Sequence, residues 1–565
     1  MNHTLHWLWK VTGIKKGYIL ALTLIQAVQG GLGVLYALLL RAIVDCAVGK
    51  DAAGFRYHAV LIVGLVLIQL SIRFMIRWLH ELARADIENT FKQRLLGNIL
   101  HKEYASVSAT HTAEWLNRLT NDTTVVADGA AEILPGFIGM AVRLISALIM
   151  IIVLDRWFAG ILIPGGAALV VLTFAFRGAL KKLHKNIQES DGRLRIYLQE
   201  HISSLMVIKS FSAEKQTFAG AAQKMEEHKT ARLLRIRFSN LANLGFGAAM
   251  QGMYLIGAIY CSYGILTGSV SYGTLTAVMQ LIGQIQGPFA NISGYLPRFY
   301  AMTASAERLM EVERCADDGP SMSAGEINEL YKELEGIGLR DASFTYRPVA
   351  DEEMPVVLDH VSLEIRKGET VAFTGHSGCG KSTVLKLLMS LLPLDEGERY
   401  YFTSSASEPL TPYHRRLFAY VPQGNVLMNG RIRDVVSFAD PAQGTDDARL
   451  RNALTIACAD EFVDDVDAVL GERGSGLSEG QMQRLAIARA VYADAPIFLL
   501  DEATSALDEA TEKKLLHNLR TLTDKTVIIV THRKAVLPFC DRVFEFTASA
   551  TGTGTLAETV SSKKA

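Results

Sequence analysis

Long apolar segments alternate with polar ones over the first half of the chain. Six of the apolar segments are long enough to cross the roughly 30 Å hydrocarbon core of a bilayer. They begin near Tyr18, His58, Ile133, Trp157, Leu241 and Tyr272. The pattern therefore predicts six membrane-spanning helices. The first is longer than the core of a signal peptide and ends in no suitable cleavage site, so we expect it to be retained.

Lysine and arginine are distributed unevenly among the segments that join these spans. Lys10, Lys15 and Lys16 precede the first span, and residues 178–237 are rich in both residue types. The loop GILTGSVSYG, ahead of the sixth span, has neither. Because cytoplasmic segments carry the excess of positive charge, we expect both termini to be cytoplasmic. The expected location is a cell membrane, either a bacterial inner membrane or a plasma membrane.

The two long cytoplasmic connections, residues 78–130 and 178–238, keep the apolar period of a helix. We therefore expect the spans to continue as helices into the cytoplasm. At the tips, residues 112–122 and 202–214 are bounded by polar side chains that can cap short helices. These tips are candidate contacts for a cytoplasmic domain.

A few polar residues interrupt the predicted spans. Arg143 lies in the third span, and Gln280, Gln284 and Asn291 share one helical face of the sixth. Polar side chains are costly in lipid unless they face a cavity or a partner. Two interpretations remain open: these residues line a polar cavity for a transported substrate, or they form hydrogen bonds between helices.

The pattern changes after the sixth span. We expect a transmembrane domain over residues 1–314 and a linker over residues 315–336, where Gly and Pro break the helical period. Short β-rich segments then alternate with helices over residues 337–548, which predicts an α/β domain with a largely parallel sheet. The Thr, Ala, Gly and Ser-rich tail, residues 549–565, is expected to be disordered.

The composition agrees with this division into domains and argues against some classes of function. A chain of 565 residues exceeds what one hydrophobic core supports, and 49% of its residues are apolar. The 57 Lys and Arg balance the 58 Asp and Glu, which argues against nucleic acid bound by net charge. The six cysteines show neither disulfide nor metal-ligand spacing.

The segment GHSGCGKS has the GxxxxGK[ST] pattern of a phosphate-binding loop, between the predicted strand ETVAFT and a helix. In this pattern backbone N–H groups surround the phosphates, Lys381 reaches the β and γ phosphates, and Ser382 ligates Mg²⁺. Cys379 makes the site sensitive to thiol reagents if the helix N-terminus favours its thiolate. The candidate nucleotide-binding residues here are Gly375, His376, Ser377, Gly378, Cys379, Gly380, Lys381, Ser382 and Thr383.

Two carboxylates and a histidine follow later strands. Asp501 and Glu502 end the apolar strand PIFLL, where the first suits Mg²⁺ and the second suits activation of water. His532 follows the strand TVIIVT. Because ligands gather at the carboxyl ends of parallel strands, we expect these residues to meet.

With these motifs in place, residues 337–545 resemble the nucleotide-binding domain of an ATP-binding cassette (ABC) transporter. Tyr346 matches the position that stacks on adenine, Gln423 matches the Q-loop, and LSEGQ differs from the family signature LSGGQ at one position, Glu479. The resemblance implies catalytic roles for Glu502, His532, Gln423 and Lys381. It implies Mg²⁺ contacts for Ser382, Gln423 and Asp501, and nucleotide contacts from Tyr346, Ser478, Gly480, Gln481 and Asp508 in addition to the loop.

The order of domains resembles a type IV exporter half-transporter: a six-helix membrane domain followed by an α/β P-loop ATPase. The resemblance implies ATP and Mg²⁺ as cofactors, a second half-transporter as partner, and a small amphipathic substrate such as a drug or lipid. A homodimer is favoured because every catalytic position is present, and a heterodimer stays open. The alternatives are an importer of a metal chelate on the same scaffold and a nucleotide-gated channel or regulator.

Glu479 stands where a phosphate-contacting turn normally has no acid. Ser478 and Gln481 have the S-x-x-Q spacing of a capping box, so a helix is expected to begin here. Glu479 then lies in the first turn, where the helix dipole favours a carboxylate. We expect the carboxylate to point away from the phosphate and the site to work. The alternative is one weakened site of a heterodimer.

Overall fold

The structure is a computed structural model that describes residues 2–346, 356–424, 427–440, 446–471, 476–548 and 554–560. The chain forms two compact units. The helical unit comprises Met1–Leu95 and Leu116–Met310, and the nucleotide unit comprises Leu96–Trp115 and Glu311–Ala565. The first cytoplasmic connection therefore belongs in part to the second unit, which the sequence did not predict.

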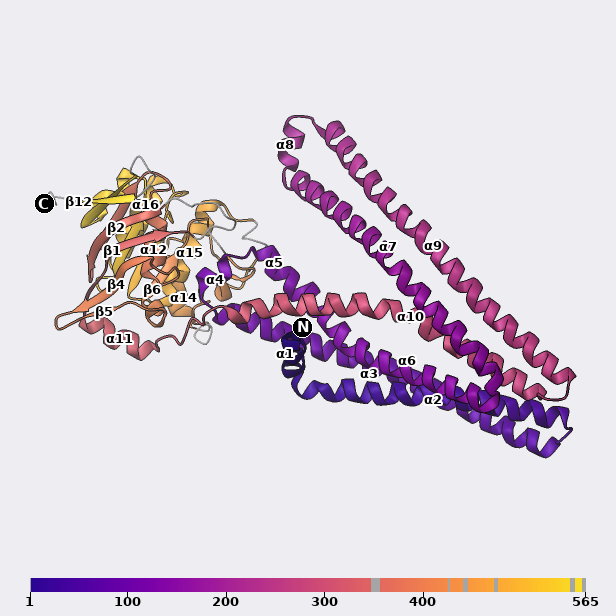
Figure 1. The fold of residues 1–565 in the computed structure, drawn as a ribbon. Helices are drawn as coiled ribbons and strands as arrows, with labels where there is room; N and C mark the ends of the chain where they lie inside the picture. Colours follow the sequence, from indigo (N-terminus) through magenta and orange to yellow (C-terminus); the bar gives the residue numbers. More distant parts are fainter. Residues whose placement is uncertain are drawn as a thin grey trace. The chain divides into compact units, whose positions relative to one another are not determined.

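Six long helices cover the six predicted spans (Figure 1). The helices of this part of the chain are α1 (Asn2–Thr12), α2 (Lys16–Val48), α3 (Ala52–His101), α4 (Tyr104–Ser108), α5 (Thr112–Asn117), the π-helical η2 (Arg118–Asp122), α6 (Thr123–Leu154), α7 (Arg156–Ser203), α8 (Leu205–Ser210), α9 (Glu214–Leu266) and α10 (Tyr272–Glu311). By length and composition, four described helical segments can cross a membrane: His3–Val48, Ala52–His101, Thr112–Leu154 and Glu214–Leu266. The helices α7 and α10 coincide with the other two predicted spans.

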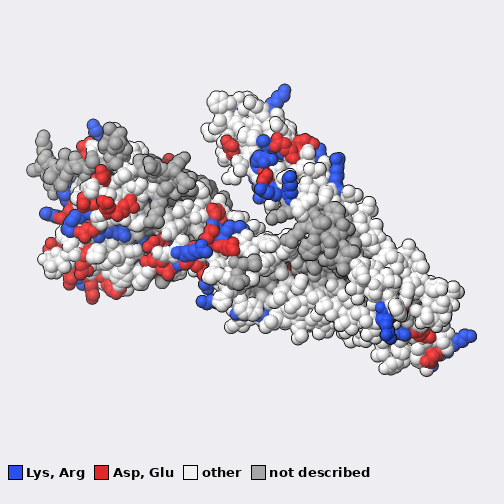
Figure 2. Space-filling view, in the orientation of Figure 1, with Lys and Arg blue, Asp and Glu red and all other residues white. Residues whose placement is uncertain are grey.

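Small residues allow the helices of this unit to approach closely. A Cβ on Gly30 of α2 would lie 2.9 Å from the carbonyl oxygen of Gly139 on α6, so backbone contact requires glycine there. The helices α7 and α9 lie side by side as a hairpin closed by α8 (Figure 1). On the face drawn in Figure 2, charged side chains gather near the helix ends, and the described atoms between them are mostly uncharged. This distribution suits segments that cross hydrocarbon.

The nucleotide unit is built on a sheet of ten strands. Its strands are β1 (Leu334–Thr345), β2 (Val356–Arg366), β3 (Thr370–Gly375), β4 (Glu396–Thr403), β5 (Ser407–Pro409), β6 (Phe418–Val421), β9 (Ile497–Asp501), β10 (Thr526–Val530), β11 (Arg542–Ala548) and β12 (Gly554–Val560), and β7 (Gly430–Arg431) pairs separately with β8 (Val469–Leu470). The adjacent strands β11, β3, β10, β9 and β6 run parallel, which confirms the α/β prediction.

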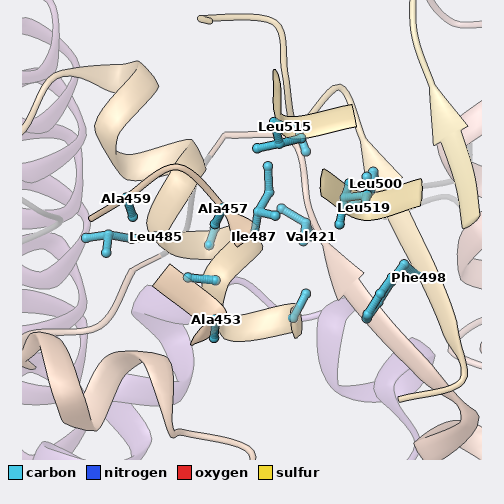
Figure 3. Close-up of a cluster of buried hydrophobic side chains, with 14 of the residues drawn as sticks. Val421, Ala453, Ala457, Ala459, Leu485, Ile487, Phe498, Leu500, Leu515 and Leu519 are labelled. Carbon is cyan, nitrogen blue, oxygen red and sulfur yellow. The ribbon is translucent and has the colours of Figure 1, made fainter. Parts of the chain in front are cut away.

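Besides α4, the described α-helices that lie wholly in this unit are α11 (Ala324–Glu333), α12 (Lys381–Leu388), α13 (Ile432–Val436), α14 (Asp447–Ile456), α15 (Glu479–Ala493) and α16 (Glu509–Arg520). Apolar residues of α14, α15 and α16 pack against β6 and β9 in one core, and Figure 3 labels Val421, Leu485 and Leu500 among its side chains. The strands β3, β9 and β10 are buried on both faces, as expected for parallel strands covered by helices. This core fixes the strand ends that carry the site.

Two boundaries differ from those expected from the sequence. Residues 324–333 of the expected linker form α11, which begins with a capping box at Ser323, and β1 begins at Leu334. The prediction of a disordered tail was wrong for residues 554–560, because β12 pairs antiparallel with β11 along its length. The composition favours disorder. A segment of alternating polar and apolar residues nevertheless forms a strand when the backbone N–H and C=O groups of a neighbouring edge strand are free to pair with it.

The short cytoplasmic helices also differ in part from the expectation. α8 lies within residues 202–214, as predicted. In the first connection α5 lies within residues 112–122, but a second short helix, α4, precedes it. Ala105 of α4 packs against the core of the nucleotide unit. The sequence assigned α4 to the preceding long helix, because its apolar residues continue the same period.

Candidate nucleotide and transport sites

The phosphate-binding loop joins β3 to α12, as the sequence predicts. Gly375, Gly378 and Gly380 have φ angles of +131°, +86° and +92°. At Gly375 a Cβ would also lie 2.1 Å from the carbonyl oxygen of Phe546, so no side chain fits. Lys381 is buried, and its Nζ donates to the carbonyl oxygens of Gly375 (2.9 Å) and His376 (2.7 Å). The lysine therefore closes the loop on itself in this state.

Cys379 does not fit the expected thiol sensitivity. Its side chain is 1% exposed, and its Sγ donates to the carbonyl oxygen of His376 at 2.9 Å. Reactive cysteines are partly exposed, whereas this thiol is enclosed beneath the loop. The expectation of thiol sensitivity therefore fails in this conformation, because loop closure buries a residue that the sequence places at a ligand site.

Asp501 lies at the end of β9, opposite the start of α12. Its Oδ1 accepts from Ser382 Oγ at 2.8 Å and its Oδ2 accepts from Tyr420 OH at 3.0 Å. Burial raises the pKa of the Asp501 carboxyl above its ordinary value; the two hydroxyls oppose this shift and Glu502 adds to it. A buried carboxylate beside a hydroxyl is an oxygen donor set that Mg²⁺ prefers. These residues therefore fit the predicted metal contact.

Glu502 contacts two of the other predicted catalytic residues. Its Oε2 accepts from Gln423 Nε2 at 2.9 Å, and its Oε1 lies 3.2 Å from Nε2 of His532. Its backbone φ is +50°, in the left-handed region that few non-glycine residues adopt. The expectation that strand ends bring these side chains together is confirmed in geometry. Their catalytic roles remain a proposal.

Tyr346 lies beside the same loop. Its hydroxyl is 3.1 Å from Thr383 Oγ1, and its ring meets that of Phe344 edge to face at 4.9 Å. This arrangement places an aromatic ring next to the phosphate-binding loop, where a base can stack. Adenine stacking by Tyr346 stays a prediction.

The signature segment forms the capping box that the sequence predicts. Ser478 Oγ accepts from Gln481 N at 3.2 Å, and Gln481 Oε1 accepts from Ser478 N at 2.8 Å. Glu479 is the first residue of α15 and is exposed. A Cβ on Gly480 would lie 2.9 Å from the carbonyl oxygen of Ala506, so this glycine permits close contact between the signature turn and the loop after β9.

That loop, residues 503–508 (the Asp508 loop), is fixed by two side chains that the sequence analysis missed. Gln483 of α15 is 2% exposed; its Nε2 donates to Ser505 Oγ at 2.9 Å, and its Oε1 accepts from Ala506 N at 3.0 Å. Arg533, next to His532, donates to the carbonyl oxygens of Leu507 (2.8 Å) and Ser505 (3.0 Å).

Asp508 ends this loop and caps α16 through Thr511 N at 3.0 Å. That hydrogen bond is the main reason why the pKa of Asp508 lies below its ordinary value. The Asp508 loop thus joins the signature helix to the histidine strand. A buried glutamine on an apolar helix face was the one available sequence signal.

Comparisons with known proteins agree with this geometry. Residues 358–505 match the model of the family described as ABC transporter, and residues 19–289 match that of the ABC transporter transmembrane region. The chain belongs to the ABC transporter family. It is therefore a multi-pass membrane protein whose ATPase domain couples ATP hydrolysis to transport.

Relatives of this ABC transporter come from several kingdoms. It is 30% identical to ABC transporter B family member 29, chloroplastic, of Arabidopsis thaliana over 76% of this chain and 67% of that protein. It is 26% identical to the ATP-dependent lipid A-core flippase of Mannheimia succiniciproducens over 90% of this chain and 87% of the other. The chain spans about half the length of some other curated relatives that it matches.

A solved structure shares the whole fold of this ABC transporter. A bacterial Atm1-family ABC exporter with ATP bound superposes with a TM-score of 0.78, covering 97% of this chain and 95% of that one at 19% identity. The exporter-like fold is thus established, and it confirms the predicted order of a helical membrane domain and an α/β ATPase domain. A half-transporter of this fold implies a dimer partner.

A polar cavity of about 370 Å³ lies among α2, α3, α6 and α10. It contains Arg143, Gln280 and Gln284, three of the four residues that the sequence assigned to a substrate cavity. The side chain of the fourth, Asn291, lies outside the described residues. The sequence analysis did not place Arg73 or Tyr36 in this cavity, which is lined by Gln29, Gly33, Tyr36, Val66, Gln69, Leu70, Arg73, Arg143, Gln280 and Gln284.

The structure also supports the alternative interpretation for one of these residues. Gln284 Nε2 donates to the carbonyl oxygen of Gly33 on α2 at 2.6 Å, which is a hydrogen bond between helices. Its Oε1 is buried without a hydrogen-bond partner among the described residues. Gln69 similarly donates to the carbonyl oxygen of Leu32 at 3.1 Å. Gln69 and Gln284 therefore both line the cavity and form hydrogen bonds between its helices.

Proposed function

We propose that the protein is an ATP-driven exporter of amphipathic compounds with an anionic head group. The observation that carries this proposal is the charge of the cavity. Arg73 and Arg143 both line it, and its lining contains no carboxylate. In the part of the chain that the structure describes, neither arginine pairs with an acidic side chain. A cation in the membrane domain marks a substrate path, and arginine is well suited to phosphate or carboxylate groups.

Amide groups complete the cavity with donors and acceptors. Gln29, Gln69, Gln280 and Gln284 line the same cavity as the two arginines. A head group with several oxygens can accept from the arginines and amides together, while an apolar tail stays in contact with the surrounding helices. The lipid A-core flippase is a relative whose name is consistent with such a substrate.

The proposed chemistry follows from the strand-end residues. Lys381 and the loop N–H groups hold the phosphates, while Ser382 and Asp501 would hold Mg²⁺, which neutralises phosphate charge. Glu502 accepts a proton from the attacking water, and His532 stabilises the charge that develops. Gln423 contacts Glu502 in this structure, so a change at the nucleotide site on ATP binding or hydrolysis can move Gln423 and be transmitted to the membrane helices.

We infer that two copies of the chain form the working unit. The tip of the α7–α9 hairpin exposes a patch of large apolar side chains: Ile202, Leu205, Met206, Val207 and Phe211. Such a patch at the end of a cytoplasmic extension suits docking onto the nucleotide unit of a second copy. The alternating-access cycle would then close two nucleotide units on two ATP molecules and reopen them after hydrolysis.

The test uses purified protein in lipid nanodiscs and in sealed vesicles. Short-chain phosphatidic acid, phosphatidylcholine and a cationic alkylammonium of equal chain length are compared as stimulators of ATPase activity. We expect stimulation in that order, and ATP-dependent flux away from the nucleotide-unit side. Equal stimulation by the cationic compound would contradict the anionic assignment. Flux toward the nucleotide side would favour an importer, and ion current without ATP turnover a channel.

A further inference from the structure

The C-terminal end of the phosphate-binding helix is held by arginines that the ATP chemistry does not use. α12 begins at Lys381 and ends at Leu388. Arg415 Nε donates to the carbonyl oxygen of Met389 at 3.2 Å, and its Nη2 donates to that of Ser390 at 3.1 Å. The last carbonyl groups of a helix have no partner within it, and cations stabilise that end.

Arg399 supports the same helix end. Its Nη1 donates to the carbonyl oxygens of Leu387 in α12 (3.4 Å) and of Leu392 (2.6 Å), and its Nε donates to that of Leu410 at 3.0 Å. Burial and the neighbouring Arg415 lower the pKa of Arg399, and Glu103 opposes this shift. Two guanidinium groups therefore meet at one end of a helix whose other end is the phosphate loop.

Arg415 also reaches the segment that follows α10. It forms a two-pronged ion pair with Asp318, in which Nη1 contacts Oδ2 and Nη2 donates to Oδ1 at 2.9 Å. The two side chains are 28% and 18% exposed, so water screens this pair less than it screens a surface pair. Paired donors and acceptors of this kind fix orientation as well as distance.

Asp318 is in turn tied to the end of α3. Its backbone N–H donates to the carbonyl oxygen of His101 at 2.9 Å, and Glu103 N donates to the carbonyl oxygen of Ala316 at 3.0 Å. Between them, Lys102 and Asp317 form an antiparallel bridge. Residues 316–318 and 101–103 thus form a short ladder, which lies within the nucleotide unit.

The side chain of Lys102 reinforces this ladder. Its Nζ donates to the carbonyl oxygen of Cys315 at 2.7 Å and lies 2.8 Å from Asp317 Oδ1. The lysine side chain is only 9% exposed. The ladder therefore has a buried cation on one side and the Asp318 carboxylate on the other, and these contacts hold its two segments together.

We propose that Asp318 and Arg415 couple the phosphate-binding helix to the end of α3. A shift of α12 on ATP binding moves its C-terminal carbonyl groups, and Arg415 passes this movement to Asp318 and the ladder. α3 runs without a break from Ala52 to His101, so the ladder is continuous with a membrane helix. Both residues are positioning residues, because neither contacts the reacting groups.

The test uses the full-length protein in nanodiscs and hydrogen–deuterium exchange, with MgATP and vanadate as the trapping ligands. In the native protein we expect trapping to change exchange both in the phosphate loop, residues 375–388, and in residues 98–108. In Asp318→Asn the change in the phosphate loop should remain. The response of residues 98–108 should fall about fivefold, within the range found for residues that carry coupling.

The controls separate coupling from folding. Asp318→Glu keeps the carboxylate and should retain most of the response. Asp494→Asn removes a carboxylate from another ion pair in the same unit, with Lys525, and should change neither response. An unchanged response of residues 98–108 in Asp318→Asn would overturn the proposal. Loss of protection at both segments without nucleotide would overturn it too, because that result marks a structural brace.

This inference rests on ATP binding and not on the proposed substrate. A failure of export or of anionic stimulation would therefore leave the exchange experiment intact. Likewise, a native protein whose residues 98–108 do not respond to trapping would refute the coupling while leaving the export proposal standing.

Discussion

Glu502 Oε1 lies 3.2 Å from Nε2 of His532, although α16 and β10 separate the two residues in the chain. Parallel pairing of β9 with β10 brings them together, because both residues follow the carboxyl ends of neighbouring strands. The backbone of Glu502 is left-handed, with a φ of +50°. The proximity of His532 is the geometric basis for the proposed activation of water by Glu502.

Glu502→Gln should abolish steady-state ATP hydrolysis while ATP stays bound. The amide keeps the contact with Gln423 but cannot accept a proton, and loss of a general base lowers turnover about 100-fold or more. Phosphate release and retention of radiolabelled ATP measure the two effects. Glu509→Gln, which removes an exposed carboxylate paired with Lys513, is the matched control and should be near normal. Near-normal hydrolysis by Glu502→Gln would refute the role.

Asp501→Asn should stabilise the nucleotide-free protein while removing Mg²⁺-dependent hydrolysis. Because burial raises the pKa of Asp501, the folded protein holds this proton more tightly than the unfolded chain. The stability that comes from the protonated form is complete below the unfolded pKa and is lost as pH rises through the folded pKa.

Unfolding temperatures of the native protein and Asp501→Asn, measured from acid to neutral pH, check this relation. The unfolding temperature of Asp501→Asn should exceed that of the native protein by an amount that grows as pH rises from the unfolded pKa to the folded pKa of Asp501. An advantage that shrinks over the same interval would contradict the assignment of burial as the cause.

Gln483→Leu should disturb the Asp508 loop without touching the nucleotide. The change leaves the N–H of Ala506 without its partner, which costs about 1–3 kcal/mol for a buried group. Added to the activation barrier, this energy corresponds to a fall in kcat of about tenfold. We expect a smaller change in KM. Steady-state kinetics measures both. Gln216→Ala, at an exposed position of α9, is the control, and equal effects of the two variants would dismiss the loop as the cause.

Arg143→Ala and Gln284→Ala should weaken stimulation by an anionic amphiphile. Loss of a hydrogen bond to a charged group costs about 1.5–3 kcal/mol, so the half-stimulating concentration should rise about tenfold or more for the arginine. Basal ATPase should change little, because both residues lie in the helical unit and not in the nucleotide unit. Arg195→Ala, whose side chain is 79% exposed, serves as the control. Unchanged transport and stimulation in both cavity variants would remove these residues from the cavity assignment.

Glu479→Gly should change ATPase activity less than about threefold, because a carboxylate in the first helical turn contributes only a fraction of a kcal/mol. The capping box that presents Ser478 and Gly480 is intact in this structure, and Glu479 is exposed. Purified protein alone should therefore hydrolyse ATP. If it does not, and Glu479→Gly restores activity, the chain is the weakened half of a heterodimer.

Local patterns determined much of what was predicted correctly. The spans, the phosphate loop, the Ser478–Gln481 capping box and the alternating strands each depend on neighbouring residues, so their spacing is visible in the sequence. The meeting of Asp501, Glu502 and His532 was also predictable, because the carboxyl ends of parallel strands share one edge. The prediction of a disordered tail was wrong for residues 554–560, because pairing with β11 determines the structure of β12.

The sequence by itself determined that a membrane domain precedes an ATPase domain and which residues stand at the phosphate loop and strand ends. Only the tertiary structure decided that Cys379 is enclosed, that Gln483 and Arg533 fix the Asp508 loop, and that Arg415 joins α12 to Asp318. The physical reason is common to all three. Burial and long-range hydrogen bonds depend on which distant segments pack together, and no local spacing records that choice.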